Sequence, residues 1–128
     1  MPKHKFRSNS EYNTYCFLKE NKVSFKYEKL IINYEWLESK KYIPDFVLSN
    51  GIILEVKGRF VLEDRKKHVL IRDQYPDMDL RILFENPNGK INKGSKTTYG
   101  MWCDKNGIKW SKRGPKGNPI PQEWLDED

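Results

Sequence analysis

Cysteine and histidine are scarce in this chain of 128 residues, which contains two of each. Cys16 and Cys103 are far apart and form no Cys-x-x-Cys pair, so neither a disulfide framework nor a cysteine zinc site is expected. His4 and His68 do not form a credible zinc pair either. We therefore expect reduced thiols and no structural zinc.

Long apolar stretches are also missing. No run approaches the roughly 18 to 20 apolar residues that cross a bilayer, and the opening stretch MPKHKFRSNSEY lacks the apolar core of a secretory signal. We expect a soluble, intracellular protein with no membrane partner.

Positive charge exceeds negative charge. The 24 lysine and arginine residues outnumber 18 acidic ones, which gives a formal net charge of +6 and an isoelectric point of about 9.2. A basic surface attracts polyanions, and nucleic acid is a better candidate than an anionic membrane. With 37% hydrophobic and 33% charged residues, the chain fits a single α/β or mixed α+β domain over residues 1–128.

The first half of the chain passes from a helical pattern to strand patterns. A Ser-x-x-Glu capping box at Ser8 predicts a helix over residues 8–20. Residues 23–36 predict one long strand or two consecutive strands. After a polar break at residues 38–41, residues 42–58 (YIPDFVLSNGIILEVKG) have the pattern of a β-hairpin.

The second half predicts a strand, a helix and a strand in succession. Residues 64–74 begin with acids and end before a proline, which is typical of a helix. The βαβ order places the apolar strand 80–85 parallel to strand 52–57. A further helix is expected over residues 95–107, and the basic residues 109–121, broken by Gly and Pro, are expected to lack regular structure.

The register of the hairpin decides whether its charged residues meet. Glu55 and Lys57 lie on one face of their strand because side chains alternate. A two-residue Asn-Gly turn would send Asp45 to the opposite face. A three-residue Ser-Asn-Gly turn, with Gly51 left-handed, would place Asp45 opposite Glu55 and keep the apolar residues together on the other face. The turn sequence permits both registers.

Two carboxylates that face each other across a strand pair repel, so something should offset that cost. Oxygen ligands without histidine or cysteine favour Mg²⁺ or Mn²⁺, held together with water and a substrate phosphate. A neighbouring ammonium such as Lys57 can orient or deprotonate a metal-bound water, or neutralise charge on a phosphoryl group. Asp45, Glu55 and Lys57 are therefore candidate catalytic residues of a metal-dependent nuclease, with ordinary strand-surface charges as the alternative.

These residues, with a glutamate upstream on a helix, resemble the PD-(D/E)xK nuclease superfamily. More closely, the chain resembles the phage endonuclease I family of Holliday-junction resolvases, of the T-seven type. The likeness spans Phe6 to Trp124 and is carried by FRS before Glu11, YIPDF, NGIILEVKG, DRKKHVLIRDQYPDMDLRILF, KGSKTTYG, CDKNGIK and IPQEW.

The resemblance implies a mixed sheet flanked by helices and an endonuclease that cleaves four-way (Holliday) junctions and branched DNA with Mg²⁺, for which Mn²⁺ can substitute. It implies that Asp45, Glu55 and the backbone carbonyl of Val56 bind the metal ions. Glu11 would contribute to a second metal position, and Lys57 would assist the attacking water. Taken alone, Glu11 is explained equally well as the acidic half of the capping box.

The resemblance also implies an intertwined homodimer. Residues 8–36 would be an exchanged helix-strand segment, residues 37–43 a bridge, and residues 44–128 the catalytic core and C-terminal region. Each site would then take Glu11 from one subunit and its other catalytic residues from the partner. For a phage-encoded protein, the expected location is the host cytoplasm.

Basic residues outside the hairpin are candidates for contact with DNA phosphates. Arg65, His68 and Arg72 recur at helical spacing on one side of helix 64–74, where a solvated charged face is the alternative. We expect Val69 and Leu70 to face the core instead. Further candidates are Arg7, Arg59, Lys67, Lys93 and Lys96.

Two other functions fit the sequence. One is a nickase or restriction-like nuclease that acts on linear duplex DNA. The other is a non-catalytic nucleic-acid-binding module in which the carboxylates only tune the surface.

Overall fold

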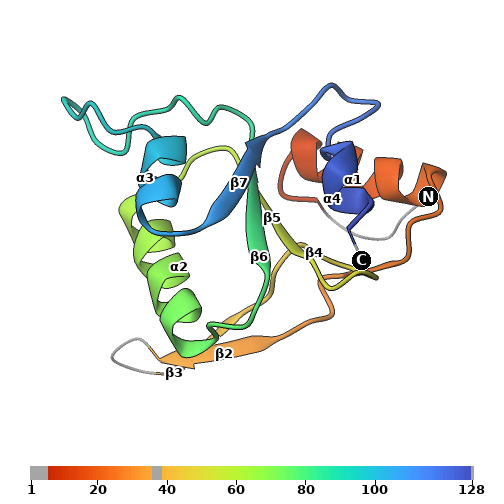
Figure 1. Ribbon diagram of the computed structural model, residues 1–128, viewed down its shortest axis with the longest axis horizontal. Coiled ribbons are helices and arrows are strands. Elements are labelled where there is room, and N and C mark those ends of the chain that lie inside the picture. The colour runs from red at the N-terminus through yellow and green to blue at the C-terminus, as the bar shows by residue number, and fades with distance from the viewer. Residues whose placement is uncertain (1–5, 36–38, 128) are drawn as a thin grey trace.

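The computed structural model describes residues 6–35 and 39–127, which form a large mixed sheet flanked by helices and a small second sheet (Figure 1). The helices are α1 (Asn9–Glu20), α2 (Leu62–Gln74), α3 (Tyr99–Lys105) and α4 (Gln122–Leu125). The strands are β1 (Phe25–Tyr27), β2 (Ile32–Glu35), β3 (Ser39–Tyr42), β4 (Phe46–Leu48), β5 (Ile53–Lys57), β6 (Leu80–Phe84) and β7 (Lys109–Lys112).

The large sheet has five strands in the order β1-β4-β5-β6-β7. The predicted βαβ unit is confirmed: β5 and β6 are parallel, with Ile53 opposite Leu80 and Lys57 opposite Phe84, and α2 connects them. β7 is parallel to β6, whereas β4 is antiparallel to both β1 and β5. The expected mixed α/β fold with flanking helices is therefore confirmed.

The two faces of this sheet are covered by different helices. Figure 1 shows α1 and α4 on one face and α2 and α3 on the other. Alternation along the strands divides the core in the same way. Leu54 and Leu83 pack with Phe17 and Leu18 of α1. Ile82, Phe84, Phe60, Cys103 and Ile108 form the core on the α3 side.

The segment predicted as one or two strands is divided between the two sheets. β1 joins the large sheet, while β2 pairs antiparallel with β3, with Ile32 opposite Tyr42. Ile32 and Tyr42 pack against Ile71 of α2. Of the predicted bridge at residues 37–43, positions 37 and 38 lie outside the described residues, and β3 occupies positions 39–42.

The prediction that residues 109–121 lack regular structure was wrong at its start, where β7 occupies residues 109–112. β7 forms because β6 offers an unpaired edge and because Ile108 and Trp110 pack onto the core of that face. Beyond it, α4 was not predicted. Trp124 and Leu125 of this short helix pack against the core beside α1. Neither element has a strong local signal, so both depend on tertiary contacts.

Helix boundaries follow their caps. α3 begins after Thr98, whose hydroxyl accepts a hydrogen bond from the Met101 N–H, and not at Ser95. Gly107 follows it with a φ of 70°. No helix in the described ranges is both long and apolar enough to cross a bilayer.

Candidate active site

The β4-β5 hairpin adopts the three-residue turn of the two registers that the sequence permits. Phe46 pairs with Leu54, and the Leu48 N–H donates to the Ile52 carbonyl at 2.8 Å. Gly51 has a φ of 93°, a left-handed conformation that glycine adopts at little cost. Continuing this register places Asp45 opposite Glu55, as the carboxylate hypothesis requires.

Asp45 and Glu55 are both buried, each about 2% exposed, although they carry the charges of the hairpin. The Val56 N–H donates to Asp45 Oδ2 at 2.9 Å. The Tyr42 hydroxyl donates to Glu55 Oε1 at 2.7 Å. The Val56 N–H and the Tyr42 hydroxyl thus fix the orientation of the two carboxylates, and oxygen lone pairs remain for further partners.

Glu11 reaches the same place from the first turn of α1. Ser8 caps the helix by accepting from the Glu11 N–H at 3.1 Å, so the capping hypothesis is half right. The Glu11 carboxylate, however, accepts from the Arg7 N–H at 2.6 Å and from the Tyr27 hydroxyl at 2.9 Å. Glu11 here meets Asp45 of its own chain, and the exchange of residues 8–36 between subunits stays a prediction.

Glu28 is a member of the site that sequence reasoning missed. Oxygen atoms of Glu11, Glu28 and Asp45 lie within 4.8 Å of one another. Glu28 follows β1 with a φ of 50°, and its N–H donates to the Asp45 carbonyl at 3.3 Å. Because Tyr27 pairs with Phe46, Glu28 stands opposite Asp45. Only the β1-β4 register reveals this. We call Glu11, Glu28, Asp45 and Glu55 the carboxylate cluster.

Two lysines lie on the Glu55 side of the carboxylate cluster. Lys57 Nζ is 3.9 Å from Glu55 Oε2 and 3.2 Å from Asp64 Oδ1. Lys67 Nζ is 3.8 Å from Asp64 Oδ1 and lies over the Tyr42 ring, 4.8 Å from its centroid. The structure therefore brings Lys57 to the position predicted for a catalytic lysine.

Burial shifts the protonation of the hairpin carboxyls. Burial raises the pKa of Asp45 to about 8, and repulsion from Glu55 adds to the shift, while the Val56 N–H opposes it. Burial also raises the pKa of Glu55, against the opposing charge of Lys57. At neutral pH Asp45 and Glu55 are therefore not both fully ionised, because two buried carboxylates resist full ionisation without a cation.

Glu11 behaves in the opposite way. Burial acts to raise its pKa, but hydrogen bonds from the Asp45 carboxyl, the Arg7 N–H and the Tyr27 hydroxyl outweigh burial and lower the pKa. Glu11 thus carries negative charge beside Asp45. Convergent carboxylate oxygens with an excess of negative charge are a suitable donor set for Mg²⁺ or Mn²⁺. Val56 contributes its N–H here, and its carbonyl as a ligand stays a prediction.

Of the three α2 residues predicted to face DNA, Arg65, His68 and Arg72, the first two point into the protein. Arg65 is 3% exposed and His68 is 1% exposed, whereas Val69 and Leu70 are only half-buried. Arg65 Nη1 donates to the Phe60 carbonyl at 2.7 Å, which satisfies its buried charge. The expected orientation of α2 was therefore wrong.

His68 is neutral in this setting. Burial, with a contribution from the positive charge of Lys67, lowers its pKa to about 3. Neither ring nitrogen has a hydrogen-bond partner among the residues described. Arg72 remains half-buried, with its guanidinium donating to the Asn106 carbonyl and to Asp73.

The other basic candidates remain at the surface or at the site. Arg59, Lys93 and Lys96 are exposed, Lys67 is partly buried beside Lys57, and Arg7 contacts the carboxylate cluster. Arg7, Lys57 and Lys67 thus place positive charge at the site that a DNA backbone could use.

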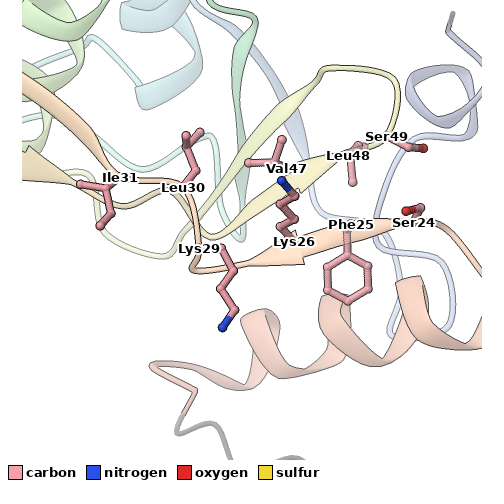
Figure 2. A pocket seen from close by; sticks show the side chains of 9 residues that line it. All are labelled: Ser24, Phe25, Lys26, Lys29, Leu30, Ile31, Val47, Leu48 and Ser49. Atoms are coloured by element: carbon pink, nitrogen blue, oxygen red, sulfur yellow. The ribbon is translucent and has the colours of Figure 1, made fainter.

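A separate groove of about 330 Å³ lies beside β1 and β4, and none of the four predicted catalytic residues lines it. Figure 2 shows Phe25 pointing toward α1, whereas Lys26 points to the other side of the strand. The groove combines two lysines with apolar side chains: Ser24, Phe25, Lys26, Lys29, Leu30, Ile31, Val47, Leu48 and Ser49. We assign it no chemistry, because it holds no acid or nucleophile beyond two serines.

Comparison with known proteins identifies the family of this chain. The family model described as phage endonuclease I matches residues 2–128. The chain is 42% identical over 123 residues to "Endonuclease I" of Escherichia phage T7, covering 95% of this chain and 79% of that protein. It is 46% identical over 104 residues to "Endodeoxyribonuclease 1" of Enterobacteria phage T3, covering 80% of this chain and 68% of that protein. The chain belongs to the phage endonuclease I family.

Proposed function

We propose that this protein is a DNA endonuclease that selects four-way and branched junctions and hydrolyses their phosphodiester bonds with Mg²⁺ or Mn²⁺. The observation that carries the proposal is the convergence of carboxylates at one place. Oxygens of Glu11 and Asp45 lie within 4.8 Å of each other and of Glu28, Asp45 faces the buried Glu55 across the hairpin, and Lys57 lies beside Glu55. Family membership supports the nuclease activity, since both named relatives are endonucleases.

The carboxylates would hold the divalent cation. When bound, that cation supplies Lewis-acid activation of water and neutralises charge on the phosphoryl group. The Val56 N–H and the Tyr42 hydroxyl fix the orientation of Asp45 and Glu55, so the oxygens are arranged before the ion arrives.

Lys57 would position the attacking water or neutralise charge that develops at the scissile phosphate. Its amine lies between Glu55 and Asp64, at 3.9 and 3.2 Å from their nearest oxygens. Asp64 thus holds the amine close to the carboxylate cluster. An ammonium there can move a proton to the leaving oxygen or orient the nucleophile.

Recognition would depend on shape and on phosphate contacts, so sequence preference should be weak. The exposed Arg59, Lys93 and Lys96, together with Lys67 and the half-buried Arg72, are the candidate contacts. A homodimer with exchanged segments would place two sites on one junction and would nick strands in pairs.

Incubation with a four-way junction and with matched linear duplex DNA in Mg²⁺ tests the proposal. We expect cleavage of the junction at rates well above the duplex, and we expect Glu55→Gln to bind the junction without cleaving it. Equal cleavage of both substrates would favour a nickase or restriction-like nuclease. A folded, junction-binding preparation that cleaves neither would leave only a binding module.

The shared active site has its own test. Glu11→Ala and Asp45→Ala subunits, inactive alone, are refolded together and assayed on the junction. If Glu11 acts in trans, each heterodimer recovers one working site and cuts one strand. A mixture that dimerises and stays inactive would mean that Glu11 acts within its own chain.

A further inference from the structure

The side chain of Arg7 lies where the carboxylate cluster converges. Its Nη2 atom donates to Asp45 Oδ1, and it is 3.3 Å from Glu28 Oε2 and 3.5 Å from Glu11 Oε2. The oxygens of these three acids lie within 4.8 Å of one another. One nitrogen thus fills the space among the three groups that are best placed to hold a cation.

The backbone and the side chain of Arg7 are held differently. The Arg7 N–H is fixed to Glu11 Oε1 at 2.6 Å, just before the cap of α1. The side chain is 60% exposed, whereas those of Glu11 and Asp45 are each 3% exposed. The guanidinium therefore enters the buried cluster from solvent and can leave it without disturbing the core.

A guanidinium and a divalent cation cannot share this space, because like charges a few ångströms apart repel strongly at the edge of a low-dielectric site. Arginine does not shed its proton at accessible pH, so it cannot resolve the conflict by becoming neutral. The conflict is resolved only when the side chain moves out. A freed guanidinium is suited to bidentate contact with a DNA phosphate.

We propose that Arg7 is a built-in competitor of the divalent cation: it pairs with Glu11, Glu28 and Asp45 in the metal-free protein, and metal binding expels it toward the DNA backbone. The inference rests on the proposed function, because it requires the same cluster to bind metal. It extends that function by coupling metal entry to the release of a phosphate-binding group beside the scissile strand. It also gives Glu28 a role, as the partly exposed acid that draws the guanidinium inward.

Calorimetric titration with Mn²⁺ at low ionic strength, on the full chain without DNA, tests the competition. Arg7→Gln should bind Mn²⁺ about tenfold more tightly than the wild-type chain, because a screened unit charge is removed from the site. Arg7→Lys, which keeps a cation, should remain within about twofold of wild type. Lys105→Gln is the matched control for net charge, since it is exposed on α3, on the other face of the sheet from α1, and its Mn²⁺ affinity should not change.

Each other outcome overturns a different part of the account. If Arg7→Gln binds Mn²⁺ no more tightly than Lys105→Gln, Arg7 is not a competitor, while the metal site stands. If Arg7→Lys binds as tightly as Arg7→Gln, charge is not the cause. If no variant and no wild-type chain binds Mn²⁺, both the competition and the proposed metal-dependent function fail.

A second readout applies if Arg7→Gln is poorly folded at room temperature. Mn²⁺ should raise the thermal unfolding temperature of Arg7→Gln by more than that of the wild-type chain, because tighter binding gives greater stabilisation. An equal or smaller rise would contradict the competition. Junction binding by Arg7→Gln in saturating metal should also weaken several-fold, and unchanged binding would remove the phosphate role.

Discussion

Two clusters of charged side chains in this molecule differ in how completely their charges are paired. On β6, Arg81 is 1% exposed, and its guanidinium is fully engaged: it donates to Asp79 at 2.9 and 2.8 Å and to Glu127 at 2.7 and 2.8 Å. The central carbon of the guanidinium lies 5.2 Å from the centroid of the Trp124 ring. We call Arg81, Asp79 and Glu127 the arginine cluster. Its charges and hydrogen bonds are mutually satisfied.

The carboxylate cluster is not satisfied in this way. Its four acids outnumber the nearby cations Arg7, Lys57 and Lys67, and Asp45 faces Glu55 across the hairpin. Burial raises the pKa of Asp45 to about 8, which measures the cost of this arrangement. The arginine cluster therefore fastens α4 and the C-terminal residues to the sheet, whereas the carboxylate cluster is suited to receive a cation.

The largest expected effect is on catalysis. Asp45→Asn should reduce junction cleavage about 10³-fold or more, since several kcal/mol of transition-state stabilisation depend on the cation. The same change should not lower the stability of the metal-free protein, because an uncharged amide avoids the cost of ionising a buried carboxyl beside Glu55. Gel-based cleavage and chemical denaturation measure the two quantities. If Asp45→Asn unfolds readily and still cleaves the junction, the carboxylate cluster stabilises the fold and does not serve catalysis.

Breaking the arginine cluster should have the opposite pattern. Arg81→Met removes the hydrogen bonds of the buried guanidinium, but Asp79 and Glu127 are about half exposed and can be hydrated once it is gone. The free energy of unfolding should therefore fall by only about 1 to 2 kcal/mol. Cleavage per folded molecule should be retained. Urea titration with an activity assay below the transition separates the effects, and full stability in Arg81→Met would show that the cluster is dispensable.

The pH dependence of stability should identify Asp45. Its pKa of about 8 in the folded protein lies far above the usual value near 4, so the folded state binds the Asp45 proton more tightly than the unfolded state does. This proton therefore adds to the free energy of unfolding in acid, and its contribution is lost as pH rises toward 8. Between pH 6.5 and 8 the metal-free protein should lose about 1.5 kcal/mol, and Asp45→Asn should abolish this slope. Saturating Mg²⁺ should also remove the slope, because a bound cation keeps Asp45 ionised throughout this interval.

The interval between pH 6.5 and 8 lies largely outside the pH ranges in which His68 and Cys103 change the stability. The pKa of His68 is lowered to about 3, so its contribution is lost only as pH falls below the unfolded value of about 6.5. The pKa of Cys103 is raised to about 12 by burial, so its effect begins as pH rises above about 8.5. A slope that persists in Asp45→Asn would have to come from another carboxyl, with Glu55 the next candidate.

The smallest effect is expected at the rim of the arginine cluster. Glu127 is nearly half exposed, and Arg81 keeps Asp79 when Glu127 is neutralised. Glu127→Gln should therefore lower the thermal unfolding temperature by less than half of the decrease in Arg81→Met. Differential scanning fluorimetry of both variants measures the ratio, and equal decreases would mean that Glu127 alone stabilises the buried guanidinium.

Sequence reasoning reached the parts of the site that depend on local rules. The two-residue period of a strand was enough to place Lys57 beside Glu55. The turn sequence offered the register that brings Asp45 opposite Glu55 but also permitted the other register, and the structure decides between them. The strand, helix and strand order was enough to make β5 and β6 parallel. These features involve residues that are close together in the chain.

The features that were missed depend on contacts between distant segments. Glu28 enters the site through the pairing of β1 with β4, and β7 forms on the edge that β6 leaves open. Arg65 on α2 was assigned to a DNA-facing surface because of its charge and its helical spacing. Carbonyl oxygens of Phe60 and Ile91 accept its hydrogen bonds, so it can be buried. Such compensation is visible only in three dimensions.

The most direct test of the central claim is the initial rate of four-way junction cleavage as a function of Mg²⁺ concentration, for the wild-type chain and Glu55→Gln. We predict a rate that rises from zero in chelator to a plateau for the wild-type chain, and a rate at least about 10³-fold lower for the variant at every concentration. Junction cleavage by the wild-type chain in chelator, or cleavage by Glu55→Gln at the wild-type rate, would contradict the account.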